Sequence, residues 1–472
     1  MKVLYAASEA YPYAMSGGLA DVAGALPKAL RRRLIGARVV LPLYESVPAE
    51  LRENMKFITS ITVPVAWRRQ YCGIFEAKYD GVIYYLLDNQ YYFKRGGLYG
   101  YYDDAERFTF FSRAVLEIIP HIDFKPDVIH CNDWQTAMTP VFYKMMYKNA
   151  PGYEDIKTVF TIHNIQYQGK YGHELIADVL GLPPEMADVV DYDGCVNLMK
   201  GAVECADWVT TVSPTYAKEI LDPWFSHGLD IELKNHAGKL SGIVNGIDTE
   251  VYNPETDPLI YKNYNAASFS GKAENKAELQ KRMGLPERPE VPIIAMVSRM
   301  VSHKGLDLVK YVFEDIVKAD LQVVILGSGD WEYEEFFGAM TRKYPDKVAL
   351  QTGFIPELAH KIYAGSDIFL MPSKSEPCGL SQMVALRYGS IPIVRETGGL
   401  HDTIFDSGDG VGNGFTFKTY NAGDMLDAVW RAVGGYANAE GWQILVKRAM
   451  ECDNSWGKSA NEYIRLYKGL CK

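Results

Sequence analysis

The chain has 472 residues, of which 48% are hydrophobic and 23% charged, and its formal net charge is −10 at pH 7. This composition is typical of a globular protein with two or three domains, and it excludes a disordered chain. The negative balance argues against nucleic acid or an anionic membrane surface as a partner.

The cysteines and the opening residues bear on the compartment. Seven scattered cysteines include no Cys-x-x-Cys pair, so neither a zinc site nor a disulfide framework is expected. The opening "MKVLYAASEAY" lacks the apolar core of a signal peptide, and no stretch is long and apolar enough to span a membrane. We therefore expect a soluble, cytoplasmic protein.

Strand-like runs recur through the first half of the chain, with helical stretches between several of them. Residues 56–90 differ, because they are typical of antiparallel hairpins inserted in a sheet. A passage rich in Pro and Asn at 245–265 ends the pattern. The predicted strands are "VLYAA", "ARVVLPL", "VIYYLLD", "DVIHC", "TVFTIHN" and "WVTTVSP".

The second half alternates strand and helix more regularly, which indicates parallel strands joined by crossover helices. Its predicted strands are "PIIAMVS", "QVVILGS", "VALQTGF", "IFLMPS" and "IPIVRE". We predict an α/β fold of two doubly wound, Rossmann-like domains facing across a cleft. Their expected ranges are 1–248 and 249–452, with 453–472 forming a helix that returns to the first domain. Ligands should bind at the carboxyl ends of the strands.

The first candidate site is the glycine turn in "YPYAMSGGLADVAGALPKAL". A strand, a turn at Gly17 and Gly18, and then a helix would let backbone N–H groups approach an oxygen-rich ligand. The alternative is an ordinary tight turn. Neither a dinucleotide-binding GxGxxG nor a P-loop motif is present.

Three strand-to-helix junctions of the second half carry further candidates. "VSRMVSHKGLDLV" places Arg299 and Lys304 where they could hold a diphosphate, although both could be plain surface charges. "IFLMPSKSEPCGLSQM" places Glu376 before a helix that begins near Gly379, and this suits a sugar attached to phosphate. The alternative for Glu376 is stabilisation of the helix dipole. "RETGGLHDT" adds a second glycine pair at 398–399.

These segments together resemble the bacterial glycogen synthase and plant starch synthase family, in order from residue 2 to about 468. The resemblance rests on "MSGGLADV", "HCNDWQT", "TIHNIQYQG", "LSGIVNGIDTEVYNPETDP", "VSRMVSHKGLDLV", "PSKSEPCGLSQM" and "RETGGLHDT". It implies the two-domain GT-B fold and a retaining transfer of glucose. The implied donor is ADP-glucose, with UDP-glucose as the alternative, and the implied acceptor is the non-reducing end of an α-1,4-glucan.

The resemblance also implies residue roles. Glu376 stands at the family's catalytic acid position beside the donor glucose. Arg299 and Lys304 match cations on the diphosphate, and His163 matches a histidine at the reacting centre, although a lone His beside a strand can also be a core residue. The donor phosphates are implied to meet the loop with Met15, Gly17 and Gly18 and the helix start at Gly379, Leu380 and Ser381. The sugar and acceptor cleft is implied to include Glu9, Asp133, Trp134 and Asn245.

No metal and no cofactor are expected, because fixed cations and helix N-termini can stabilise charge on a departing diphosphate. "DYD" at 191–193 looks like a metal-binding DxD motif but lies away from the junctions. Val384 stands where related transferases carry a second Glu, which favours the synthase family. Phosphorylases are far longer and bind pyridoxal phosphate. The tyrosine-rich stretch 89–108 could stack on glucan or simply form a packed loop.

Met15 departs from the family pattern, which has Lys before the glycine turn. Methionine neither carries charge nor donates a hydrogen bond, so we expect reduced activity. The alternatives are a glucan-binding relative with weak or no transferase activity, or a Met15 that packs under the loop while another cation replaces it. Retention of Glu376, Arg299, Lys304 and His163 argues against complete loss.

Overall fold

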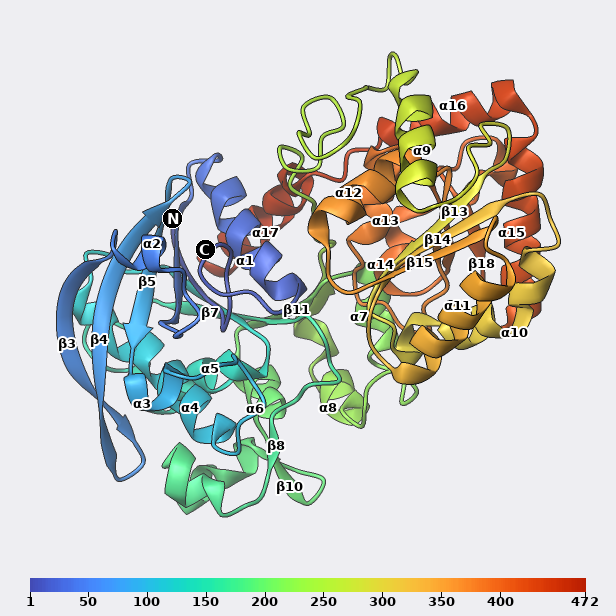
Figure 1. The fold of residues 1–472 in the computed structure, drawn as a ribbon. Helices are drawn as coiled ribbons and strands as arrows, with labels where there is room; N and C mark the ends of the chain where they lie inside the picture. The colour runs from blue at the N-terminus through green and yellow to red at the C-terminus, as the bar shows by residue number, and fades with distance from the viewer. The chain divides into compact units, whose positions relative to one another are not determined.

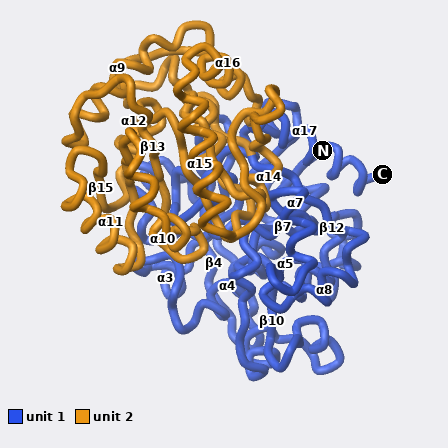
Figure 2. Tube along the Cα trace, turned by 90° about the vertical axis from the view of Figure 1, so that its right-hand side faces the viewer, with its two compact units in different colours: residues 1–245, 456–472 blue, residues 246–455 orange.

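The computed structural model describes residues 1–472, and the chain divides into two compact units (Figure 2). Unit 1 contains residues 1–245 and 456–472, and unit 2 contains residues 246–455. The expected boundaries at 248 and 452 lie three residues from these divisions. No helix has the length and apolar character needed to cross a membrane.

Unit 1 is built on a nine-stranded sheet in the order β12-β11-β7-β6-β1-β2-β5-β4-β3. Figure 1 labels the strands β3, β4, β5, β7 and β11 of this sheet. The seven strands from β12 to β5 are parallel, and β4 and β3 continue antiparallel, which confirms the prediction for residues 56–90. The bounds are β1 Lys2–Ala6, β2 Gly36–Pro42, β3 Lys56–Val65, β4 Arg68–Tyr79, β5 Val82–Asp88, β6 Val128–Asn132, β7 Lys157–Ile162, β11 Trp208–Thr211 and β12 Leu240–Gly242.

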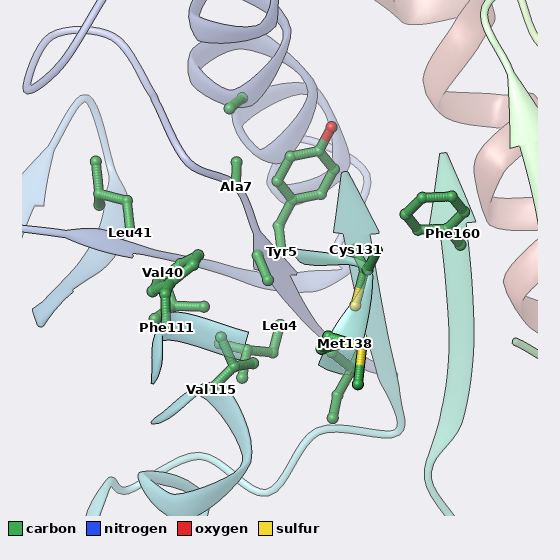
Figure 3. Close-up of a cluster of buried hydrophobic side chains, with 14 of the residues drawn as sticks. Leu4, Tyr5, Ala7, Val40, Leu41, Phe111, Val115, Cys131, Met138 and Phe160 are labelled. Atoms are coloured by element: carbon green, nitrogen blue, oxygen red, sulfur yellow. The ribbon is translucent and has the colours of Figure 1, made fainter. Parts of the chain in front are cut away.

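The two faces of this sheet differ in character. Leu4 lies with Phe111 and Val115 in an apolar layer, whereas Tyr5 points to the opposite side (Figure 3). The apolar layer includes helix α4, Asp104–Glu117, and helix α5, Met138–Phe142. Successive strand residues point to opposite faces, so a strand buried on both faces carries a continuous apolar run. The other face meets helix α17, Trp456–Leu470, which packs against α1, Gly18–Arg31.

Smaller elements complete unit 1. A second sheet in the order β8-β10-β9 lies outside the main one. Its strands are Lys170–Tyr171, Cys195–Asn197 and Asp191–Tyr192, and the remaining helices are α2 Ala49–Arg52, α3 Gln90–Phe93, α6 Leu198–Cys205, α7 Pro214–Glu219 and α8 Asp230–Asn235.

Unit 2 has one parallel sheet in the order β15-β14-β13-β16-β17-β18. The strands are β13 Ile293–Val297, β14 Gln322–Gly327, β15 Val348–Thr352, β16 Ile368–Met371, β17 Ile391–Arg395 and β18 Phe415–Phe417. The helices are α9 Gly271–Arg282, α10 Leu306–Ile316, α11 Trp331–Lys343, α12 Pro356–Gly365, α13 Ser381–Arg387, α14 Gly398–Thr403, α15 Ala422–Tyr436 and α16 Ala439–Met450.

Among its parallel strands, each sheet reverses its strand order at one place, between β1 and β6 in unit 1 and between β13 and β16 in unit 2. Ligands of open α/β sheets bind outside the carboxyl ends of the strands at such a switch point. The loops that follow these four strands contain Glu9 and Gly17, Asp133, Arg299, and Glu376.

Candidate functional site

In unit 1, the loop between β1 and α1 folds back on Glu9. This side chain is buried, and its Oε2 accepts the backbone N–H groups of Ser16 at 2.5 Å and Gly17 at 3.3 Å. Burial raises the pKa of the carboxyl group, while these hydrogen bonds oppose the rise. Glu9 therefore stabilises the glycine turn through hydrogen bonds to its backbone. The N–H group of Gly17, which the sequence predicted to be available to a phosphate, already donates to Glu9.

The glycine turn is open on its outer side. Gly17 and Gly18 are exposed, and a Cβ built on Gly18 meets nothing within 4 Å. Met15 beside them is 53% exposed, so it does not pack under the loop. In the first turn of α1, which begins at Gly18, the Ala20 N–H donates to the Gly17 oxygen at 3.2 Å, and the N–H groups of Gly18 and Leu19 have no acceptor within the helix. A phosphate could approach this turn without displacing a side chain.

Asp133 follows β6 in a strained conformation. Its φ of 54° lies in the left-handed region, which a residue with a Cβ rarely adopts. Its Oδ1 accepts the backbone N–H of His163 at 2.8 Å, and burial raises its pKa to about 7. Strain and a raised pKa at a switch point are features of functional sites. Trp134, next to it, is buried and packs edge-on against Phe108.

His163 follows β7 and lies beside the end of β6. Its Nε2 is 2.8 Å from Oδ1 of Asn132, and burial lowers its pKa to about 3, so the ring is neutral at pH 7. Asn245, at the end of the first segment of unit 1, is also buried, and its Oδ1 has no hydrogen-bond partner. A buried amide oxygen without a partner is unusual in a folded protein, and a ligand hydroxyl would satisfy it.

Some side chains of the tyrosine-rich stretch 89–108 are buried, and others are exposed to solvent. Tyr92 is buried, and the Tyr99 hydroxyl lies 2.7 Å from Oγ of Ser8. Tyr91 and Tyr102 are 64% and 92% exposed. Part of this stretch is therefore a packed loop, and the exposed rings remain candidates for stacking on sugars.

In unit 2, Glu376 and Lys304 form an ion pair next to the switch point. Lys304 Nζ lies 2.6 Å from Oε2 of Glu376, and Ser373 Oγ donates to the same oxygen at 2.9 Å. Burial opposes ionisation of Glu376, but the Lys304 ammonium and the Ser373 hydroxyl outweigh it and hold its pKa below the usual value. Glu376 is therefore a carboxylate at neutral pH. Arg299 is exposed, and its guanidinium has no partner in the chain.

The backbone around Glu376 is held by close contacts with two neighbouring loops. A Cβ on Gly305, whose φ is 73°, would lie 2.0 Å from the Pro372 oxygen. A Cβ on Gly398, whose φ is 45°, would lie 2.0 Å from the Glu376 oxygen. The N–H of Gly399 donates to that same oxygen at 3.2 Å. The second glycine pair thus permits close packing under Glu376, whereas the first is open to solvent.

The turn before α13 is fixed by Gln382, which sequence reasoning did not single out. Its Nε2 donates to the backbone oxygens of Cys378 at 3.1 Å and Gly379 at 3.0 Å. Gly379 has a φ of 71°, and Leu380 leads into α13, which starts at Ser381. Because the first N–H groups of a helix lack acceptors within it, this turn can receive an oxygen-rich ligand.

The DYD segment holds no metal-ligand cluster. Asp191 lies 2.9 Å from Nε2 of His173, and the chain contains no group of three or more His, Cys, Asp or Glu residues arranged to bind a metal ion. Val384 is buried in α13. The predicted residues therefore form two sets, one in each unit. The set of unit 1 is Glu9, Met15, Gly17, Gly18, Asp133, Trp134, His163 and Asn245, and the set of unit 2 is Arg299, Lys304, Glu376, Gly379, Leu380 and Ser381.

Comparison with known proteins gives consistent matches along the chain. Residues 2–235 match the family described as starch synthase catalytic domain, and residues 277–437 match glycosyl transferases group 1. Glycogen synthase from Bacillus cereus (strain ATCC 10987 / NRS 248) is 53% identical, with all of both chains covered. Glycogen synthase from Geobacillus stearothermophilus is 52% identical over 100% of this chain and 98% of the relative.

Solved structures agree with the sequence relatives. The catalytic domain of starch synthase IV from Arabidopsis thaliana, bound to ADP and acarbose, has a TM-score of 0.92 at 36% identity and 99% coverage of both chains. Sucrose-phosphate synthase from Thermosynechococcus elongatus, with a TM-score of 0.61 at 17% identity, supports the fold alone. None of these matches supports the alternative of a glucan-binding relative without transferase activity. The chain belongs to the glycogen synthase family of hexosyltransferases and has the two-domain GT-B fold.

Proposed function

We propose that this enzyme transfers the glucosyl group of ADP-glucose to the non-reducing end of an α-1,4-glucan with retention of configuration. The observation that carries the proposal is the buried Glu376–Lys304 pair beside an unpaired Arg299 at the switch point of unit 2. The ADP and acarbose bound to the Arabidopsis starch synthase support the choice of an adenine nucleotide and an α-glucan.

Unit 2 is proposed to hold the donor. Cleavage of the bond between the anomeric carbon and the diphosphate leaves negative charge on phosphate oxygens. Arg299, Lys304 and the N–H groups of Gly379, Leu380 and Ser381 are the groups suited to stabilise it. The reaction then needs no metal ion or cofactor.

Glu376 is proposed to act as an anion and not as a proton donor, because its pKa is held low. A carboxylate beside the donor sugar can accept hydrogen bonds from hydroxyl groups and stabilise positive charge on the anomeric carbon. The new bond joins that carbon to the acceptor oxygen, and the proton of the acceptor hydroxyl leaves with the nucleoside diphosphate.

Unit 1 is proposed to bind the acceptor glucan and to contact the phosphate groups of the donor. Glu9, Asp133, Trp134 and Asn245 are the residues proposed for the sugar and acceptor, and His163 for the reacting centre. The open turn at Gly17 and Gly18, with Met15 beside it, is proposed to cover the donor phosphates.

The decisive experiment measures nucleoside diphosphate release from ADP-glucose and from UDP-glucose, with and without glycogen, in excess EDTA. We expect glycogen-dependent release of ADP that EDTA leaves intact. A matched Glu376→Gln variant, which keeps the shape and removes the charge, should lose about 100-fold or more in kcat. Release only from UDP-glucose would correct the donor, no release from either would contradict the function, and collapse in EDTA with recovery on Mg²⁺ would contradict metal independence.

We also infer a cytoplasmic location from the cysteines. All seven are free thiols, four of them buried, as expected for a reducing compartment.

A further inference from the structure

Asn132 ends β6 inside the core of unit 1, and all of its polar groups have partners. The side chain is fully buried. Thr136 Oγ1 accepts its backbone N–H at 2.6 Å and donates to its backbone oxygen at 2.8 Å. Its Nδ2 donates to the backbone oxygens of Ala6 at 2.9 Å and His130 at 3.4 Å. Four hydrogen bonds to three residues therefore hold Asn132 in place.

These contacts determine which way the amide faces. A carbonyl oxygen can only accept, so the side-chain group facing Ala6 and His130 must be the NH₂ group. The Oδ1 atom then faces the Tyr5 hydroxyl at 2.8 Å and the Nε2 atom of His163 at 2.8 Å. Because an amide oxygen has no proton to give, both groups must donate to it.

We propose that Asn132, with Tyr5 as its partner, is a positioning residue that holds His163 in the tautomer with its proton on Nε2. The catalytic consequence rests on the role proposed above for His163. With Nε2–H engaged, Nδ1 is left as an acceptor, and the ring cannot donate to substrate through Nε2. The backbone N–H of His163 is held separately by Asp133, so both its ring and its main chain are constrained.

The chemistry of β6 favours this role over simple packing. A strand covered on both faces normally carries apolar residues, and a buried amide stabilises nothing unless its hydrogen bonds are made. The same polar layer contains a second group of hydrogen bonds, in which His130 Nδ1 lies 2.7 Å from the Tyr467 hydroxyl and Nε2 lies 2.6 Å from Thr161 Oγ1. Tyr467 supplies a matched control, because its hydroxyl is bonded to His130 in this layer and to neither Asn132 nor His163.

The test is a two-bond ¹H–¹⁵N correlation spectrum of the full chain labelled at its nine histidines, with His163 assigned by its loss in His163→Gln. We expect the Nε2–H tautomer in the parent. In Asn132→Leu, which has similar volume and no acceptor, the His163 signals should move to the Nδ1–H form or to a mixture. Tyr467→Phe should leave the His163 signals unchanged.

Activity supplies the second measurement. Asn132→Leu should lower kcat about 10- to 100-fold, as expected when a reacting group is misplaced, with a smaller change in KM for the nucleotide sugar. Tyr467→Phe should lower thermal stability with kcat retained. Asn132→Ala replaces the leucine variant if that variant does not fold.

Three results would overturn the proposal. They are an Nδ1–H tautomer in the parent, an unchanged tautomer in the Asn132 variants, and equal effects of Tyr467→Phe and Asn132→Leu on kcat. A parent that transfers no glucose would instead contradict the proposed function, and the tautomer spectra would still decide the role of Asn132.

Discussion

Met15 offers the sharpest test at the scale of single residues. It is 53% exposed beside an open glycine turn, so a lysine fits there without repacking. We expect Met15→Lys to raise kcat/KM for ADP-glucose by about 10-fold, the value of one charge-assisted contact to phosphate. Met15→Gln, which can donate a hydrogen bond but has no charge, is the control and should gain much less.

An unchanged or lower kcat/KM in Met15→Lys would mean that the turn works with methionine as it stands. Both variants should be measured with the same glycogen preparation, since the expected gain concerns only the donor.

The Lys304–Glu376 pair makes a prediction about coupling. Loss of Lys304 leaves a buried carboxylate without its counter-charge, and breaking such a pair costs about 3 kcal/mol or more. We expect Lys304→Met to destabilise the protein, and the double variant Lys304→Met/Glu376→Gln to recover at least half of that loss. Urea unfolding of the four proteins measures the coupling. Strictly additive effects would show that the two side chains do not stabilise each other.

Asp133 makes a pH-dependent contribution to stability. Its pKa is raised from 3.8 to about 7, so between these values the folded protein keeps a proton that the unfolded chain releases. The free energy of unfolding contributed by Asp133 therefore falls as pH rises from about 4 to 7 and stays low above that. Asp133→Asn should remove this pH-dependent loss of stability, because asparagine does not ionise.

The measurement is the melting temperature of both proteins from pH 5 to pH 8. We expect the melting temperature of Asp133→Asn to rise relative to that of the parent as the pH increases through this range. A difference that stays constant with pH would mean that Asp133 ionises normally in the folded protein.

At the scale of elements, the two glycine pairs have different physical roles. A Cβ on Gly399 would lie 2.1 Å from the Cys378 oxygen, whereas one on Gly18 meets nothing within 4 Å. We expect Gly399→Ala to destabilise the protein by about 2 kcal/mol or more, because backbone atoms must move. Gly18→Ala should change stability by less than about 0.5 kcal/mol and instead raise KM for the donor.

Thermal unfolding and donor kinetics of the two variants separate these roles. Equal stability losses would contradict the contrast between a packed and an open turn, and an unchanged donor KM in Gly18→Ala would contradict close approach of the donor at α1.

The long strands of both sheets could be predicted from sequence because each is an apolar run between polar turns, as in "DVIHC" and "IFLM". The edge strands β12 and β18 have three residues each, too few to produce a pattern. The sequence also predicted that Arg299, Lys304 and Glu376 lie close to the ends of strands. Their roles remain predictions.

Contacts formed by tertiary folding could not be predicted. Glu9 accepts hydrogen bonds from Ser16 and Gly17 because the loop between them folds back on it. The Tyr5 hydroxyl donates to Asn132, which lies on another strand and 127 residues away in sequence. The available signal was the pair of polar residues His130 and Asn132 in a short strand between predicted buried strands, where buried polar groups require partners.

At the scale of the whole molecule, unit 1 depends on a segment far away in sequence. Helix α17 packs on α1, and Tyr467 hydrogen-bonds His130 in the sheet. We expect a chain ending at Ser455 to lose cooperative unfolding of unit 1 while unit 2 stays folded. Limited proteolysis should then cut within residues 1–245 and spare 246–455. Equal resistance of both units would show that α17 is dispensable.

The connecting segments have a consequence for the order of events during synthesis. Ile247 donates to the Asn454 oxygen at 2.9 Å, so unit 2 begins and ends at one place, as an insertion between Asn245 and Trp456. The ribosome therefore completes residues 246–455 before it makes α17. At typical translation rates this interval lasts roughly 10 to 40 seconds, during which the nascent sheet of unit 1 exposes the face with Tyr5 and His130 that α17 later covers. Slower translation of unit 2 would lengthen that exposure and raise the demand for chaperones.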